Sequence, residues 1–400
     1  KRIFTLTIGI LVLFTWQCTR DSQNSVQSPN GQTEVEFMLT QKGQPAYRVI
    51  HKDVVVIDTS LLGFDLKEAP SIKEGWSLVK ATRSAENNTW EMPWGEQKEV
   101  VNHYNQITLQ LEENKAASRK LNLVFRAYDD GIGFRYVFPE QENLKEVFIT
   151  DENTQFNLTG DHKTWWIPGD WHIYEHLYNT TRFTDIDATS KRNDPNLAQT
   201  HIPENAVNTP VTMKTDAGLH LSFHEADLTD YAGMTLKVFK NELMFQSELV
   251  GSDLRDYKVE GKVPFETPWR TIQISQDAAG LIESNLIVNL NDPNKLGDIP
   301  WFEPMKYAGI WWEMHLGKST WAIEGGKHGA TTGHAKEMID FAAENNIGGV
   351  LVEGWNTGWN RWIGFEDREG VFDFVTPYPD YDLKEVARYA REKGVQLIMH

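Results

Sequence analysis

The chain has 400 residues, 40% of them hydrophobic, which is enough for two or more domains with separate cores. Its formal net charge of −18 argues against a nucleic-acid partner, which would need a basic surface to neutralise phosphates. Its 15 tryptophans are a high count for this length and are typical of proteins that handle sugars, because the apolar faces of hexose rings stack on indole.

The N-terminus has the pattern of an export signal. Two basic residues precede an apolar run at residues 3–16 that is too short for a comfortable transmembrane helix. Cys18, the only cysteine, follows directly, so an intrachain disulfide is impossible. Its position resembles a bacterial lipoprotein signal with the lipid on the cysteine, although Gln17 is bulkier than the usual small residue. We predict a lipoprotein-type signal peptide at residues 1–18, a polar linker at 19–31, and export to the periplasm or outer membrane.

Residues 32–300 have the pattern of an antiparallel β domain. Short alternating apolar runs, such as 47–57, 121–125 and 132–138, are separated by turn residues. Asp129-Asp130-Gly131 lies between two runs, where a hairpin turn belongs. Because no strong helical period appears, we predict a large β-sandwich, longer than one immunoglobulin-like module.

After Pro300 strands and helices alternate. Apolar runs at residues 307–312, 348–353 and 395–400 are predicted strands, with segments of helical spacing between them. This order predicts parallel βαβ units in residues 301–400, the start of a barrel or of a doubly wound sheet. A dinucleotide-binding fold is disfavoured, because no Gly-x-Gly-x-x-Gly follows these strands. The chain starts without Met and stops on a strand, so we expect it to be the N-terminal part of a longer protein.

The stretch from Val350 to Trp362 is the strongest local indication of function. An apolar strand ends there on a single acid, Glu353, and a loop with three tryptophans, two asparagines and an arginine follows. Aromatic platforms beside convergent polar groups favour a sugar site, since the C-terminal ends of parallel strands carry the chemistry of α/β folds. The alternative is a loop that only caps a core.

Seven segments together resemble the motif series of glycoside hydrolase family 97, in matching order from about residue 30 to the end. They are residues 128–136 (YDDGIGFRY), 208–210 (NTP), 224–226 (HEA), 267–270 (TPWR), 311–314 (WWEM), 352–356 (VEGWN) and 372–380 (FDFVTPYPD). The resemblance implies an N-terminal β-super-sandwich of the galactose-mutarotase type and a (β/α)8 TIM barrel, of which this chain holds the first third, followed by a small β-domain. It also implies exo-acting, calcium-dependent α-glycosidases, mostly inverting α-glucosidases with a subgroup of retaining α-galactosidases.

The resemblance also assigns site residues. Glu175 matches a glutamate that the sandwich contributes to a Ca2+ site, and Trp312 matches the tryptophan that packs on the sugar in the −1 subsite, with Trp311 as the alternative. Glu353 and His400 match residues that bind sugar hydroxyls. The general acid and base are expected after His400, so we expect the chain alone to bind sugar weakly and to show no turnover.

Three functions therefore stay open. The first is an exo-acting α-glucosidase whose substrate is a starch-type oligosaccharide. The second is a retaining α-galactosidase of the same family. The third is a non-catalytic glycan-binding surface lipoprotein, which the regular βαβ segment disfavours.

Overall fold

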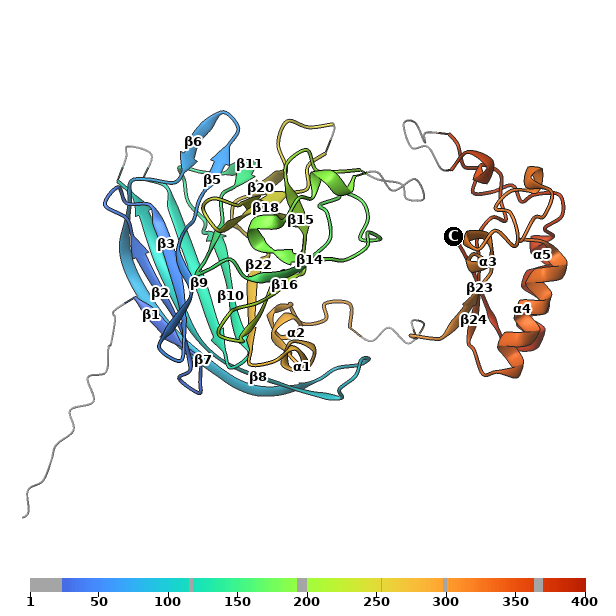
Figure 1. Cartoon of the computed structure of the whole chain (residues 1–400), viewed down its shortest axis with the longest axis horizontal. Helices are drawn as coiled ribbons and strands as arrows, with labels where there is room; N and C mark the ends of the chain where they lie inside the picture. Colours follow the sequence, from blue (N-terminus) through green and yellow to red (C-terminus); the bar gives the residue numbers. More distant parts are fainter. Residues whose placement is uncertain are drawn as a thin grey trace, which may run out of the picture. The chain divides into compact units, whose positions relative to one another are not determined.

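A computed structural model describes residues 24–114, 118–192, 200–252, 254–297, 301, 303–362 and 370–400. They form two compact units, the first ending at Asp292 and the second beginning at Pro293 (Figure 1). The signal peptide and Cys18 predicted at residues 1–18 lie outside the described residues. In the described part of the chain, no helix combines the length and the apolar character needed to cross a membrane.

Antiparallel sheets build the first unit. An eight-stranded sheet has the order β1 (Ser25–Gln27), β2 (Thr33–Leu39), β3 (Pro45–His51), β4 (Val54–Leu61), β12 (Gln155–Leu158), β19 (Met244–Leu249), β18 (Met234–Phe239) and β15 (Ala206–Asn208). A ten-stranded sheet has the order β14 (Asn179–Arg182), β13 (Lys163–Trp166), β16 (Val211–Lys214), β17 (His220–Ala226), β22 (Trp269–Ser275), β10 (Gly131–Phe138), β9 (Lys120–Tyr128), β8 (Glu99–Glu113) and β7 (Trp76–Glu91), with β21 (Phe265–Glu266) paired to β10. A four-stranded sheet consists of β20 (Val259–Lys262), β11 (Glu146–Glu152), β5 (Phe64–Leu66) and β6 (Ala69–Ile72).

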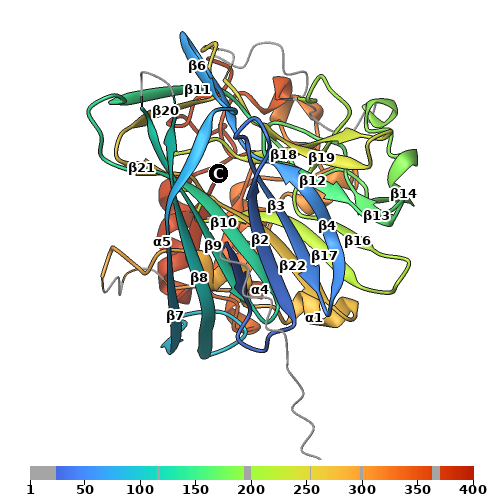
Figure 2. The same cartoon turned by 90° about the vertical axis from the view of Figure 1, so that its left-hand side faces the viewer.

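The two large sheets pack face to face, as the two views of the unit show (Figures 1 and 2). The ring of Tyr47 on β3 lies 4.8 Å from that of Phe134 on β10, and Phe156 on β12 lies 5.5 Å from Phe223 on β17. These side chains are buried, because alternate residues of each strand point into the space between the sheets. The predicted antiparallel β-sandwich is confirmed.

The sandwich begins inside the segment predicted as a polar linker at residues 19–31. Strand β1 pairs with β2, with Val26 opposite Val35, and both valines are buried. One inward apolar side chain and a short antiparallel ladder suffice to fix this strand. The linker prediction is therefore wrong from Ser25 to Gln27.

The unit also contains short helices, which the sequence pattern did not indicate. They are η1 (Phe183–Asp185), η2 (Thr189–Lys191), α1 (Ala278–Ile282) and α2 (Leu286–Leu290). Helix α2 packs on β10 where glycines leave room, since a Cβ at Gly133 would lie 2.5 Å from Leu290. Asp130 at the turn before β10 accepts hydrogen bonds from Ser284 and Asn285, which precede this helix.

The second unit contains a parallel sheet of three strands, β23 (Tyr307–Gly309), β24 (Gly349–Val352) and β25 (Gln396–Met399), in that order. Its helices are α3 (Trp312–His315), η3 (Ile323–Gly325), α4 (Thr332–Glu344), η4 (Trp359–Arg361) and α5 (Leu383–Lys393). Asp382 caps α5 through the backbone N–H of Glu385, and Gly394 ends the helix with a φ of 71°. The predicted parallel βαβ units are confirmed, and the barrel that they would open stays a prediction.

One local prediction in this unit is wrong. The first strand ends at Gly309 and not at Trp312, because the chain turns into α3 once the carbonyl of Trp311 accepts from the N–H of Met314. Of the two aspartates before α5, only Asp382 caps the helix, and Oδ2 of Asp380 lies 2.8 Å from Nδ1 of His328.

Candidate functional site

Glu353 and His400 lie together at the C-terminal edge of the parallel sheet. Each directly follows a strand, β24 or β25, and these strands are neighbours in parallel register. Nδ1 of His400 lies 3.4 Å from Oε1 of Glu353. The Glu353 side chain is 18% exposed and the His400 side chain 74%, so one polar group is recessed and the other faces solvent. The structure brings together two of the predicted site residues.

The residue after Glu353 is fixed by its backbone conformation. Gly354 has a φ of 79°, and a Cβ at this position would lie 2.7 Å from the carbonyl oxygen of Trp321. Only glycine combines this dihedral angle with such a close approach. The indole N–H of Trp355 then donates to the carbonyl of His400 at 3.3 Å, which ties the two loops together.

His328 anchors the same loop. Its Nε2 lies 2.8 Å from the carbonyl oxygen of Gly354 and its Nδ1 lies 2.8 Å from Oδ2 of Asp380. The side chain is 3% exposed. Because a carbonyl can only accept, Nε2 carries a proton and the imidazole is fixed in orientation. Sequence reasoning missed His328, since its partners lie 26 and 52 residues away and no short motif surrounds it.

The three tryptophans of the loop after β24 have different roles. Trp355 and Trp359 are buried, and the indole N–H of Trp359 donates to the fully buried Asn356 at 2.9 Å. Trp362 is half-buried. Not all three tryptophans of this loop are therefore available as sugar platforms, because Trp355 packs in the hydrophobic core of the second unit.

A fourth tryptophan, Trp321, joins this loop from the segment after β23. Its ring stacks on Trp359 with centroids 5.1 Å apart and planes within 8°, and Trp362 meets Trp321 edge-on at 4.9 Å. These indoles line a pocket of about 400 Å³, together with Thr320, Ala322, Glu324, Gly325 and Asn360. The sequence did not indicate Trp321, which is isolated among non-aromatic neighbours.

Trp312 lies in the short helix α3 and is 58% exposed. The neighbouring Trp311 meets it edge-on at 5.2 Å and is less exposed. Of the two indoles, Trp312 therefore offers the larger surface for stacking, and its role in sugar binding stays a prediction.

Glu175, the predicted calcium ligand, lies in an exposed loop of the first unit. The start of the loop is held by Asp170, whose carboxylate accepts hydrogen bonds from the backbone N–H groups of His172 and Ile173. Asn208 accepts from the N–H of Asp170 and donates to the carbonyl of Ile173. The fully buried Asn208 thus explains one segment of the motif series.

Glu175 can supply one ligand to a calcium ion. A carboxylate is a hard oxygen donor, but calcium takes about six to eight oxygens, so Glu175 needs further ligands. Among the described residues, the group of metal-binding side chains that gathers is Asp170, His176 and His201, with ligand atoms within 4.8 Å of one another. Two of its three members are imidazoles, which calcium does not prefer.

Asp170 is better explained as an anchor for the loop than as a metal ligand. Besides the two backbone groups, it accepts from the N–H and hydroxyl of Thr200 and lies 3.1 Å from Nε2 of His176. Burial alone would raise the pKa of Asp170, but these donors outweigh it and hold the pKa below its ordinary value. The carboxylate is therefore ionised and saturated with hydrogen bonds.

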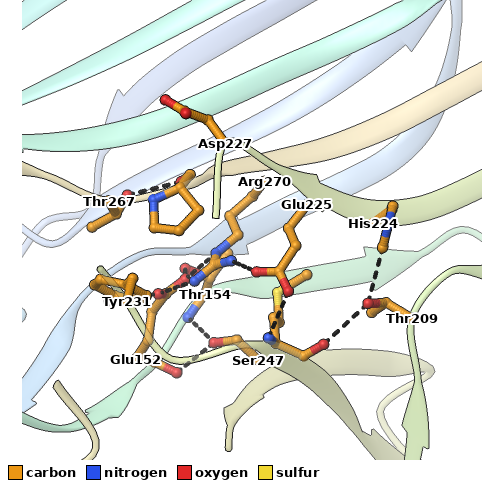
Figure 3. A network of polar contacts seen from close by, with 12 residues as sticks. Glu152, Thr154, Thr209, His224, Glu225, Asp227, Tyr231, Ser247, Thr267 and Arg270 are labelled. Carbon is orange, nitrogen blue, oxygen red and sulfur yellow. Dashed lines mark hydrogen bonds and ion pairs between the residues drawn. The ribbon is translucent and has the colours of Figure 1, made fainter. Parts of the chain in front are cut away.

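A buried ionic network joins three strands of the first unit (Figure 3). The guanidinium of Arg270 on β22 bonds Glu152 on β11 at 2.6 and 2.8 Å and Glu225 on β17 at 2.5 Å. Burial alone would lower the pKa of Arg270, but the two carboxylates outweigh it and raise the pKa. Every carboxylate oxygen of the network has a protein donor, including Tyr231 and the N–H of Met234. The network is therefore structural.

His224 belongs to the same region of Figure 3 and has a structural role. Its Nδ1 lies 3.1 Å from the hydroxyl of Thr209, which donates to the carbonyl of Met234. Burial lowers the pKa of His224, so the neutral imidazole is favoured. Thr209 follows Asn208, and the contact thus supports the residue that holds the Glu175 loop.

Comparison with known protein families accounts for most of the chain. The family model described as "Glycosyl-hydrolase 97 N-terminal" matches residues 26–293, and the model "Glycoside hydrolase 97" matches residues 311–400. A retaining α-galactosidase from Bacteroides thetaiotaomicron is 23% identical over 98% of the chain and 57% of its own length. A probable retaining α-galactosidase from Streptomyces bingchenggensis is 24% identical over 69% of the chain and 36% of its own length.

Solved structures give a similar result. A glycoside hydrolase family 97 enzyme from Pseudoalteromonas sp. strain K8, determined as a variant in complex with panose, is 39% identical, with a TM-score of 0.82 over 93% of the chain and 53% of that enzyme. The same enzyme has been determined with acarbose, with a TM-score of 0.81. A β-arabinopyranosidase shares the fold with a TM-score of 0.72 at 18% identity. The chain thus spans about half the length of these relatives.

Proposed function

Because the chain belongs to glycoside hydrolase family 97, we propose that the full-length protein is an exo-acting α-glucosidase that removes glucosyl residues from the non-reducing ends of starch-type oligosaccharides. The observation that carries this proposal is the Glu353–His400 pair at the C-terminal edge of the parallel sheet, on a chain 39% identical to an enzyme determined with panose. Panose is an α-linked glucosyl trisaccharide. Its presence in that relative supports glucose over galactose.

The chain's own residues would bind and orient the terminal sugar. The carboxylate of Glu353 accepts hydrogen bonds from sugar hydroxyls, and the exposed imidazole of His400 can donate or accept at a neighbouring hydroxyl. Trp312 offers an indole face for the apolar side of the ring. An inverting mechanism needs an acid and a base about 6.5–9.5 Å apart, and we expect both after His400.

Calcium is part of the proposal. Glu175 would provide one carboxylate oxygen, and the loop anchored by Asp170 and Asn208 would hold that oxygen in place. When bound, the ion would offset the negative charge of its carboxylate ligands and polarise a sugar hydroxyl.

We further propose export to the periplasm or outer membrane with a lipid on Cys18. The supporting observation is the sequence pattern of residues 1–18. Fractionation of cells that express the full-length protein tests this. A Cys18→Ser variant is expected to move from the membrane to the soluble exported fraction, and an unchanged membrane fraction would contradict lipidation.

A retaining α-galactosidase is the second candidate. Two curated relatives carry that description, at 23% and 24% identity. Hydrolysis of 4-nitrophenyl α-glucoside and α-galactoside by the full-length protein separates the candidates. A preference for the glucoside supports the first, a preference for the galactoside supports the second, and no turnover of either would favour a glycan-binding protein without catalysis.

The same assay tests the site residues. Glu353→Gln and His400→Ala are expected to lower kcat/KM by about tenfold to a hundredfold, since the first replaces a charge-assisted hydrogen bond to the sugar by a neutral one and the second removes a hydrogen bond. Glu344→Gln, at an exposed position at the end of α4, is the matched control. Equal activity of Glu353→Gln and the control would remove Glu353 from the site.

A further inference from the structure

A row of aromatic side chains continues from Trp312 to the tryptophan pocket. The ring of Trp312 lies 6.1 Å from that of His315, and His315 meets Trp321 edge-on at 5.0 Å. Trp321 is in turn in contact with Trp359 and Trp362, which complete the pocket. A chain of ring contacts therefore leads from the proposed platform for the terminal sugar to the tryptophan pocket.

The pocket has the composition of a sugar site. Its volume of about 400 Å³ falls in the range of small-molecule pockets. The buried Trp359 forms part of its floor, whereas the half-buried Trp321 and Trp362 keep surface for contact. Glu324 and Asn360 are exposed and lie on the pocket's lining, where a carboxylate and an amide can bind hydroxyl groups.

The pocket is also tied to the residues of the terminal-sugar site. The backbone of Trp321 is in close approach to Gly354, the neighbour of Glu353. Trp359 is fixed by Asn356, which donates to the carbonyl of Asp373 at 2.8 Å. The platform is therefore held rigidly on the same loop as Glu353, which reduces the ordering cost of binding.

We propose that this pocket is a subsite for the glucosyl units on the reducing-end side of the cleaved bond. The inference rests on the proposed function, because an exo-acting enzyme places the non-reducing end in its −1 subsite and any further sugar surface contacts the leaving portion. Trp321 and Trp362 stack on successive rings, and Glu324 binds their hydroxyls. The site favours longer α-glucans over short substrates.

The test compares two substrates of the full-length enzyme. Maltotetraose extends into the pocket, whereas α-glucosyl fluoride has a leaving group of one atom and cannot reach it. In Trp362→Ala the ratio of kcat/KM for maltotetraose to kcat/KM for the fluoride is expected to fall about tenfold, the loss of one stacking contact. Trp362→Phe is expected to restore part of the ratio, because a smaller aromatic face remains.

Two further variants keep the test decisive. Trp94→Ala, at a tryptophan that is 44% exposed between β7 and β8 of the first unit, is the control and is expected to leave the ratio unchanged. Glu324→Gln keeps the packing and is expected to lower the ratio even if Trp362→Ala folds poorly. An unchanged ratio in both Trp362→Ala and Glu324→Gln would overturn the subsite. Failure of the wild type to hydrolyse the fluoride would instead overturn the proposed function.

Discussion

Gly354 is the residue on which the position of Glu353 most directly depends. Its positive φ lets the chain turn at the end of β24, and the carbonyl of Trp321 occupies the place of a side chain. His328 then fixes the carbonyl of the same glycine. At this scale the site is defined by one backbone conformation and one buried imidazole.

Gly354→Ala tests this view against a matched control. Gly326 has nearly the same φ, 77°, but a Cβ at Gly326 would meet no atom within 4 Å. Both alanine variants incur the left-handed strain of about 1–2 kcal/mol, and only Gly354→Ala adds a clash. We expect a larger fall in the thermal unfolding midpoint and in kcat/KM of the full-length enzyme for Gly354→Ala than for Gly326→Ala. Indistinguishable variants would contradict the argument.

Among the elements, the strands β11, β17 and β22 are joined by the buried Arg270 network. Glu152 lies in the four-stranded sheet, and Glu225 and Arg270 lie in the ten-stranded sheet, so the ion pairs join two sheets. Removal of the Arg270 guanidinium leaves the buried carboxylates of Glu152 and Glu225 without a positive charge beside them. Loss of one member of a buried ion pair lowers stability strongly, even where the intact pair adds little net stability.

Arg270→Met is therefore expected to lower the free energy of unfolding by about 3–5 kcal/mol in urea titrations. Lys42→Met is the control, because the Lys42–Glu74 pair is exposed and surface pairs contribute about 0–1 kcal/mol. A loss below about 1 kcal/mol for Arg270→Met would show that the carboxylates find other partners or become protonated at little cost.

Some of the strands could be predicted from the sequence, and others could not. Alternation predicted β9 and β10, and continuous apolar runs predicted β24 and β25, since these patterns depend on local burial. The first parallel strand is shorter than predicted, because Trp311 is the N-cap of helix α3 and Trp312 is its first residue. The contacts of His328 join residues far apart in the chain, and a single sequence holds no pattern for such pairs.

The candidate site was also predictable only in part. The proximity of Glu353 and His400 followed from the topology of parallel strands, whose C-terminal ends meet. The packing of Trp355 in the core and the contact of Trp321 with this loop depend on the tertiary packing of side chains. The spacing of residues along the sequence does not encode such packing. Glu175 remains a prediction as a calcium ligand.

For the whole molecule, four buried or half-buried histidines of the sandwich link stability to pH. Burial lowers the pKa of His51, His162, His201 and His224. A lowered pKa means that the unfolded chain binds protons more readily, so this contribution is complete above the ordinary histidine pKa of about 6.5 and is lost as pH falls through the folded pKa. We expect the urea midpoint of the chain to be lower at about pH 5.5 than at about pH 7.5.

His224→Gln is expected to make this dependence shallower, since it removes one of the four groups and can keep a hydrogen bond to Thr209. His172→Gln, at an exposed position, is expected to leave the dependence as it is in the wild type. A His224→Gln slope equal to that of the wild type over the same pH interval would contradict a role for His224.

The most direct test of the proposed function follows the anomer that the full-length enzyme first releases. Proton NMR records the initial product from aryl α-glucoside and α-galactoside, with calcium and then with a chelator. We predict rapid release of β-glucose that the chelator abolishes and added calcium restores. Release of α-galactose would contradict the proposal and assign the protein to the retaining α-galactosidases, and activity that survives the chelator would contradict the calcium site at Glu175.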